Sequence, residues 1–380
     1  MSSHHPPLFY LVDWLPPDFG AVGQYGLISA HELAAAGRDV YLIGLTSGRP
    51  HRQREDFEGA GSLEIHPLET SPYNKSRNIE RLLWTFRVNV RIIRAVLRNP
   101  ASRNADVLFT GAPPFMLFFA MALKVLRKVR LIYRITDFYP EVIIADRGRS
   151  SLPLALLQRL TWFLRRRVDA FEALGEDQRQ ILVRGGVPPE RISIKRDRSP
   201  IVDTDLKHAV MPPAELGGRK VLLYSGNFGL AHDVNTVVEG LALHHRSGSA
   251  RFGLWLNATG RNTEVVASRL SAANVPFTRT MPVSLDRLGS LLAAADVHLI
   301  TLRPEFSGIV LPSKIYACLA SGRPIVFIGP TSSDVHLLCS QTPGLAYARV
   351  EPGDAAGFAN ALDRFAVAPA TNRLTNAQRS

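Results

Sequence analysis

The sequence predicts an α/β protein made of two Rossmann-like domains, with mostly parallel sheets that face each other across a cleft. A length of 380 residues, 46% of them apolar, is enough for two hydrophobic cores. Short apolar strands alternate with helical segments in both halves of the chain. A polar, proline-containing stretch at residues 196–220 separates the two series. We therefore assign residues 1–200 and 201–380 to two domains and expect the last helix to pack back on the first domain.

The N-terminal half opens with a β-loop-α-β unit, which is typical of a doubly wound sheet. An apolar strand at residues 8–12 leads through a glycine loop into a helix at residues 24–36, and the next strand follows at residues 40–43. An uncharged run at residues 107–123 is divided by Pro113-Pro114, so we interpret it as strand, turn and buried helix and not as a membrane span. Further strands are expected at 106–110, 130–135 and 169–174, and helices at 78–98, 114–126, 151–167 and 176–184.

The C-terminal half repeats this alternation of strands and helices. Ser284 is a plausible N-cap for one of the helices. The expected strands are 221–225, 252–257, 297–302 and 325–328, and the expected helices are 233–246, 262–273, 285–295 and 313–321. This pattern indicates a second Rossmann-type domain.

Two glycine-containing turns follow the first two strands of the C-terminal half. The first strand runs into Gly226, Asn227 and Gly229, where small residues let backbone amides approach a ligand. The second strand ends at Gly260 and Arg261, whose forked cation suits a phosphate. A plain turn and a surface arginine remain the alternative interpretation of these two segments.

A later segment combines several features that favour an anion. Pro312 and Ser313 open a short helix and Gly322 ends it, while Pro324 prevents its continuation. The start of the helix therefore offers free N–H groups, a hydroxyl and the ammonium of Lys314 in one place. These groups suit a diphosphate, and the alternative is a capped helix with a solvated lysine.

Five short motifs lie between residues 8 and 330, and their order along the chain is the basis of a family resemblance. They are Pro16-Pro17-Asp18-Phe19-Gly20-Ala21, Thr136-Asp137-Phe138-Tyr139-Pro140-Glu141, Tyr224-Ser225-Gly226-Asn227-Phe228-Gly229, Met281-Pro282-Val283, and Pro312-Ser313-Lys314 through Gly322-Arg323-Pro324. In these motifs the chain resembles the bacterial family 4 glycosyltransferases of GT-B fold, in particular the branch that builds surface polysaccharides such as colanic acid and O-antigen.

The resemblance implies a retaining hexosyltransferase that moves a sugar from a nucleotide-sugar donor to a lipid-linked or surface-polysaccharide acceptor, with no cofactor and no metal. It implies that Arg261 and Lys314 neutralise the leaving diphosphate and that Met281 and Pro282 border the base. The implied donor-binding residues are Gly20, Gly23, Gly226, Asn227, Gly229, Gly260, Met281, Pro282, Glu305, Pro312 and Ser313.

The chain departs from the family at two positions. The family often carries two glutamates eight positions apart, and here these positions hold Ile309 and Ala317. Glu305 lies four residues before the first and is a candidate substitute for ribose recognition. The departure leaves two alternatives to a transferase open: a GT-B sugar-nucleotide epimerase, and a glycosyltransferase-like binding protein without catalysis.

Two acidic residues of the N-terminal half are candidate catalytic groups. Asp137 directly follows a predicted strand, and Glu141 lies four residues later. We expect them to activate the acceptor or to stabilise a cationic sugar transition state. The alternative is a helix cap at Asp137 and an exposed Glu141.

The charge of the chain is unevenly distributed. The net charge is +12, with +9 in residues 1–200 (29 Lys+Arg less 20 Asp+Glu) and +3 in residues 201–380 (16 less 13). Residues 75–103 hold eight Lys+Arg and one acidic residue, and Arg159 and Arg165–Arg167 form a second cluster. Helical spacing predicts a basic amphipathic helix, whose apolar stripe faces either the core or an anionic membrane. We expect peripheral attachment to the cytoplasmic face of the plasma membrane, and no nucleic-acid binding, since no such motif occurs.

Overall fold

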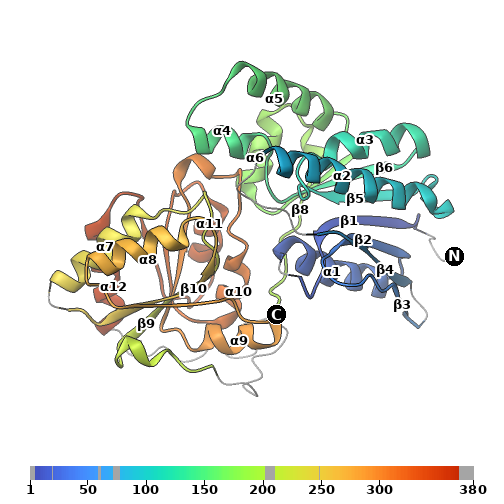
Figure 1. Ribbon diagram of the computed structural model, residues 1–380. Helices are drawn as coiled ribbons and strands as arrows, with labels where there is room; N and C mark the ends of the chain where they lie inside the picture. Colours follow the sequence, from blue (N-terminus) through green and yellow to red (C-terminus); the bar gives the residue numbers. More distant parts are fainter. Residues whose placement is uncertain are drawn as a thin grey trace. The chain divides into compact units, whose positions relative to one another are not determined.

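The computed structural model describes residues 5–18, 20–58, 61–71, 78–201, 210–247 and 249–367. The chain divides into two compact units, Met1–Asp197 and Arg198–Ser380. In each unit, helices cover a sheet (Figure 1). Phe19 of the first motif, the start of the basic segment at residues 75–77 and the chain after residue 367 lie outside the described residues.

The sheet of the N-terminal unit has the strand order β3-β4-β2-β1-β5-β6-β7-β8. β3 pairs antiparallel with β4, and the other neighbours pair in parallel. The strands are β1 (Leu8–Trp14), β2 (Val40–Thr46), β3 (Gln53–Asp56), β4 (Ser62–Glu69), β5 (Asp106–Thr110), β6 (Arg130–Ile135), β7 (Ala170–Ala173) and β8 (Ile192–Ile194). The helices are α1 (Ala21–Ala35), α2 (Asn78–Arg98), α3 (Met116–Arg127), α4 (Glu141–Arg147), α5 (Leu152–Arg165) and α6 (Glu176–Arg184).

Alternation along β1 separates the two faces of this sheet. Leu8, Tyr10 and Val12 belong to a buried cluster that includes Ala30 and Ala34 of α1. Phe9 points to the opposite face, where it stacks on Tyr41 of β2 with ring centroids 4.7 Å apart. On that face α2, α3 and α5 lie side by side (Figure 1). Successive side chains of a strand point to opposite faces of the sheet, and this alternation determines which helices each residue contacts.

Helix α2 buries a different stripe from the one that the sequence predicts. Its deepest side chains include Val88, Ile92 and Val96, at i, i+4 and i+8. Leu82 and Phe86, which we expected on the apolar stripe toward the core or a membrane, are 61% and 59% exposed. The first half of α2 therefore presents large apolar side chains to solvent.

The C-terminal unit has the strand order β11-β10-β9-β12-β13-β14, with every neighbour parallel. Its strands are β9 (Lys220–Asn227), β10 (Phe252–Thr259), β11 (Phe277–Thr280), β12 (Val297–Thr301), β13 (Ile325–Ile328) and β14 (Tyr347–Val350). Its helices are α7 (Asn235–Arg246), α8 (Thr263–Ala272), α9 (Leu285–Ala293), α10 (Lys314–Ser321), α11 (Asp334–Gln341) and α12 (Ala355–Val367). This is the strand order of a dinucleotide-binding Rossmann sheet.

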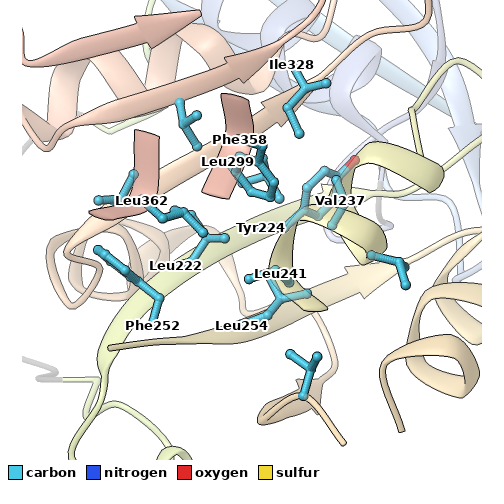
Figure 2. Close-up of a cluster of buried hydrophobic side chains, with 14 of the residues drawn as sticks. Leu222, Tyr224, Val237, Leu241, Phe252, Leu254, Leu299, Ile328, Phe358 and Leu362 are labelled. Carbon is cyan, nitrogen blue, oxygen red and sulfur yellow. The ribbon is translucent and has the colours of Figure 1, made fainter. Parts of the chain in front are cut away.

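Side chains from β9 alternate between two cores in the C-terminal unit. Leu222 and Tyr224 pack with α7 and α12 in the cluster that Figure 2 shows. Val221 and Leu223 pack on the other face with Leu291 of α9. Both faces are buried, so the strand is a continuous apolar run.

The last described helix belongs to the core of the C-terminal unit. Phe358 and Leu362 of α12 lie in the same buried cluster as Val237 and Leu241 of α7 (Figure 2). The expectation that the last helix packs on the N-terminal domain stays a prediction. Within the described part of the chain, no helix is long and apolar enough to cross a membrane.

Candidate functional site

The order of the C-terminal sheet reverses between β9 and β12. From β9 the chain builds outward to β10 and β11, and it then returns to place β12 on the other side of β9. In open α/β sheets, ligands bind at the carboxyl ends of the strands that flank such a reversal. These ends are Asn227 of β9 and Thr301 of β12. The predicted phosphate-binding motifs meet at this edge.

Lys314, the first residue of α10, places its ammonium beside the loop that follows β9. Its Nζ lies 3.1 Å from the centroid of the Tyr224 ring, and a Cβ added to Gly226 would lie 3.8 Å from it. The residue is half-buried, but Nζ itself is shielded from solvent and has no hydrogen-bond acceptor among the described residues. Burial lowers the pKa of Lys314 to about 7. A shielded ammonium without an acceptor is a group prepared for an anionic ligand.

His232 is a neighbour of Lys314 that sequence analysis missed. Its Nδ1 lies 2.8 Å from the carbonyl oxygen of Thr301, and its ring meets Tyr224 edge to face. Burial, and then the Lys314 ammonium, lower its pKa to about 3. The imidazole is therefore neutral near pH 7, so Lys314 is the one of these two groups that can carry a positive charge there. Its position between the glycine turn and α7 is the sequence signal that could have indicated it.

The two glycine turns contact each other closely. The Phe228 amide donates to the Thr259 carbonyl oxygen over 2.6 Å, and the Asn262 amide donates to the Phe228 carbonyl oxygen over 3.0 Å. Gly260 has a φ of +115°, and a Cβ there would lie 2.3 Å from Asn227 Oδ1. The structure thus brings Gly226, Asn227, Gly229 and Gly260 together, and it leaves Arg261 on the exposed rim.

Met281 and Pro282 follow β11, two strands away from β9. Asn257 of β10 donates to the Met281 carbonyl oxygen over 2.6 Å and to Thr280 Oγ1 over 2.8 Å. The Met281 side chain is 68% exposed, which is unusual for methionine. Asn257, which the sequence did not suggest, therefore fixes the segment expected to border the base.

Ala317, at one of the family's two glutamate positions, and Glu305, the candidate substitute, lie in different environments. Ala317 packs in an apolar cluster with Leu223 and Trp255, so it belongs to the core. Glu305 is exposed and forms an ion pair with Arg303, which also donates to the Leu230 carbonyl oxygen over 3.1 Å. Glu305 is thereby tied to the loop after β9. Its role as a substitute for the missing glutamates stays a prediction, as do the roles of Pro312 and Ser313 at the start of α10.

The N-terminal unit places two carboxyl groups at the corresponding edge of its own sheet. Asp13 lies at the end of β1, which flanks the reversal between β1 and β5, and Asp137 follows β6. The pKa of Asp13 is raised to about 7, chiefly by burial; backbone N–H groups oppose this rise and Asp137 adds to it. Burial raises the pKa of Asp137 to about 6. Asp13 Oδ1 has no hydrogen-bond partner among the described residues. Raised carboxyl pKa values at a strand end are typical of acid-base sites.

The glycine loop between β1 and α1, which contains Gly20 and Gly23, lies against the end of β1 beside Asp13. A Cβ at Gly23 would lie 1.8 Å from the Trp14 carbonyl oxygen, so only glycine lets α1 approach β1 this closely. The Gly23 backbone N–H lowers the pKa of Asp13, and a Cβ at Gly20 would lie 3.6 Å from Asp13 Oδ1. The loop thus helps to hold a carboxyl group, beside its predicted role toward the donor.

The raised pKa of Asp13 predicts a pH-dependent gain from Asp13→Asn. The native carboxyl keeps its proton up to about pH 7, while the unfolded one ionises near pH 4, so its burial costs stability as the pH rises between these values. At pH 8 the variant should gain on the order of 2 kcal/mol of unfolding free energy, and near pH 4 little. Denaturant unfolding at both pH values measures this. Asp18→Asn is the control: Asp18 accepts from the Ser47 amide over 2.8 Å, so that variant should lose stability at pH 8. A gain for Asp13→Asn that is equal at both pH values would contradict the assignment.

Glu141 is engaged in a buried ion pair. Both of its oxygens accept from Arg165, over 2.7 and 3.0 Å, and Arg165 is fully buried. The Arg165 guanidinium also lies over the rings of Phe138 and Trp162. Glu141 is therefore not exposed, as the alternative interpretation held, and Arg165 engages both of its carboxylate oxygens. The structure does not support the catalytic role that we expected for it.

Comparison with known proteins identifies one matching family and several relatives that cover most of the chain. The family described as glycosyl transferase 4-like domain matches residues 20–195. The probable glycosyltransferase WbjE of Pseudomonas aeruginosa is 21% identical over 301 residues, which cover 76% of this chain and 72% of that protein. The putative colanic acid biosynthesis glycosyl transferase WcaI of Escherichia coli (strain K12) is 25% identical over 363 residues, 88% of this chain and 86% of that protein. The solved structure of Anabaena HepE in complex with UDP and glucose has a TM-score of 0.63 at 10% identity, covering 95% of this chain and 89% of that one. These matches confirm the family resemblance that the motifs predict.

Proposed function

Because the chain is a glycosyltransferase of GT-B fold with a glycosyl transferase 4-like domain at residues 20–195, we propose that it is a retaining hexosyltransferase that uses a nucleotide-sugar donor without a metal ion. One observation carries the donor assignment: the shielded Lys314 ammonium has no acceptor among the described residues and lies beside the glycine turn after β9. The structural relative HepE is in complex with UDP and glucose, which supports the same donor class.

The negative charge that develops on the leaving diphosphate explains the proposed role of the Lys314 ammonium. Breaking the bond between sugar and phosphate leaves negative charge on the diphosphate, and fixed cations and helix N-termini stabilise that transition state. Lys314 supplies the cation at the first turn of α10, whose free N–H groups favour an anion as well. Arg261 on the rim of the same edge adds a second cation. With this charge supplied by the chain, we propose that no metal is needed.

Asp137 and Asp13 are our candidates for the acceptor side of the reaction. Their raised pKa values, about 6 and about 7, keep a proton-accepting group near neutral pH. We assign to them acceptor activation or stabilisation of positive charge on the sugar. Glu141 has no part in this proposal, because Arg165 occupies both of its oxygens.

The acceptor is proposed to be lipid-linked or part of a surface polysaccharide, with the enzyme attached to the inner face of the plasma membrane. Neighbouring helices α2, α3 and α5 expose large apolar side chains, which we call the apolar surface: Leu82, Leu83, Phe86, Val125, Leu126, Leu152, Leu156, Leu160 and Phe163. Clustered exposed apolar residues with arginines beside them suit insertion between anionic lipids. The relative WcaI is described as a colanic acid biosynthesis enzyme, which supports a polysaccharide product.

Membrane attachment predicts that two substitutions release the protein from vesicles. Phe86→Ser with Leu156→Ser removes two exposed apolar side chains, each worth roughly 1.5–3 kcal/mol when buried, so binding should fall more than about tenfold. Co-sedimentation with anionic vesicles at low salt measures this. Val265→Ser, which removes an exposed valine from α8 in the other unit, is the control and should bind like wild type. Equal binding of all three proteins would reject the apolar surface as the attachment site.

A panel of nucleotide sugars tests the reaction class. Incubation of the protein with each donor, with and without a membrane extract as acceptor source, should give transfer with the extract and slow donor hydrolysis without it. An epimerised donor would instead identify a sugar-nucleotide epimerase. Tight binding with no turnover of any donor would identify a binding protein, in keeping with the loss of the usual glutamates at Ile309 and Ala317.

A further inference from the structure

A pocket of about 580 Å³ opens on the surface of the N-terminal unit, and the proposed reaction makes no use of it. It lies between α2 and the face of the sheet that carries Phe9 and Tyr41. All of its lining residues come from the N-terminal unit. Its volume is that of a pocket for a small molecule.

The spacing of residues explains how the chain builds this pocket. Arg91, Arg94 and Arg98 are at i, i+3 and i+7 of α2, so they lie on one helix face, and all three line the cavity. On the sheet, Ile43 of β2 pairs with His66 of β4, and both line the cavity. These three arginines are exposed and lie beside the buried stripe of Val88, Ile92 and Val96, so guanidinium groups line the α2 side of the pocket.

The charges in this pocket are unbalanced. Among the described residues, no carboxylate pairs with Arg91, Arg94 or Arg98. Arg52, a fourth lining arginine, lies 2.9 Å from His66 and 4.0 Å from Glu64, the one carboxylate among the lining residues. Burial, and then Arg52, lower the pKa of His66, so the imidazole is neutral near pH 7. Four guanidinium groups less one carboxylate leave a charge of +3.

We propose that this pocket binds a phosphate or diphosphate group carried by a molecule with an apolar or flat part. Guanidinium forks bind phosphate oxygens in pairs, and a group with two or more negative charges matches the surplus better than a single carboxylate. The half-buried Tyr41 and Leu68 form an apolar wall for the rest of the ligand, and the buried Phe9 ring stacks behind Tyr41. The proposal does not depend on the donor reaction, because no residue of the donor site takes part in it.

Titration with inorganic pyrophosphate and binding to vesicles test the proposal. The titration uses Lys314→Met as background, which removes the shielded cation of the donor site. In this background, Arg94→Gln with Arg98→Gln should weaken pyrophosphate binding by about tenfold or more, because two charge-assisted contacts are lost. The control is Arg87→Gln with Arg103→Gln, which also removes two exposed charges from the N-terminal unit but none from the pocket lining. A parallel series uses vesicles of phosphatidylglycerol and of phosphatidylcholine.

The two series distinguish the sources of the phosphate group. Loss of pyrophosphate binding in the pocket pair, but not in the control pair, supports a pocket open to soluble phosphorylated ligands. Loss confined to phosphatidylglycerol vesicles, and larger in the pocket pair than in the control pair, supports a lipid headgroup as the ligand. Equal losses in both pairs would show a general charge effect and overturn the proposal. Wild-type behaviour of the pocket pair toward both probes would overturn it too.

Discussion

Replacing Lys314 with methionine is expected to lower donor turnover by roughly 100- to 1000-fold, the loss that follows removal of one group aimed at developing charge. The ammonium is held over the ring of Tyr224 beside Gly226, where the diphosphate is proposed to leave. Methionine keeps the length and volume of the side chain but carries no charge. Turnover of the donor that the panel identifies, measured at saturating concentration, tests this result.

The same variant should not lose stability. A shielded ammonium without an acceptor costs free energy in the folded state, and the lowered pKa of Lys314 reflects that cost. Since the native pKa of about 7 lies below that of the unfolded chain, the cost is full at pH 6 and declines as the pH rises above 7. The melting temperature of Lys314→Met should therefore equal or exceed that of wild type, most clearly at pH 6.

A second lysine provides a control for this experiment. Lys220 lies at the opposite end of β9, where its ammonium donates to the Phe365 carbonyl oxygen over 3.1 Å. Lys220→Met should leave turnover close to wild type. Wild-type turnover of Lys314→Met would reject the phosphate role, and a fall in its melting temperature would reject the assignment of an uncompensated charge.

The fold could be predicted from the sequence where strands are buried on both faces. β1, β5, β9, β10 and β12 contain apolar runs, and β6 is apolar apart from Arg130 and Arg134. The order of these strands and of the helices between them predicts a doubly wound sheet. β3 and β4 escaped prediction because β3 has four exposed polar residues and β4 carries polar side chains and Pro67. β11, β14 and α11 are short and lie at or near the sheet edge, where no apolar run marks them.

Some residues of the candidate site could be predicted from the sequence and others could not. Glycine turns and the start of α10 are local patterns, so Gly226, Gly260 and Lys314 could be found by reading along the chain. Asp13 could not, because its meaning comes from burial and from Asp137, which lies on a different strand. The fate of Glu141 likewise depends on Arg165, 24 residues later on another helix. Burial and long-range pairing decide which carboxyl groups are free, and neither is visible in local spacing.

The ion pair of Glu141 predicts the largest loss of stability among these variants. Glu141→Ala leaves the fully buried Arg165 guanidinium without a counter-charge, which should cost about 3–5 kcal/mol of unfolding free energy. Glu141→Ala with Arg165→Met removes both charges and should regain most of that loss. Glu176→Ala, which breaks the more exposed pair with Arg179, should cost no more than about 1 kcal/mol.

Measuring both the unfolding free energy and the donor turnover of these variants distinguishes a structural role of Glu141 from a catalytic one. Denaturant unfolding, followed by a probe in the N-terminal unit, measures the losses, and donor turnover is measured on the same samples below the unfolding transition. The double variant should turn over donor within a few-fold of wild type, because the proposed chemistry uses Asp13 and Asp137 and requires of Glu141 only that Arg165 be neutralised. A double variant that is stable but inactive would restore the catalytic role, since a carboxylate needed only for packing can be replaced together with its partner.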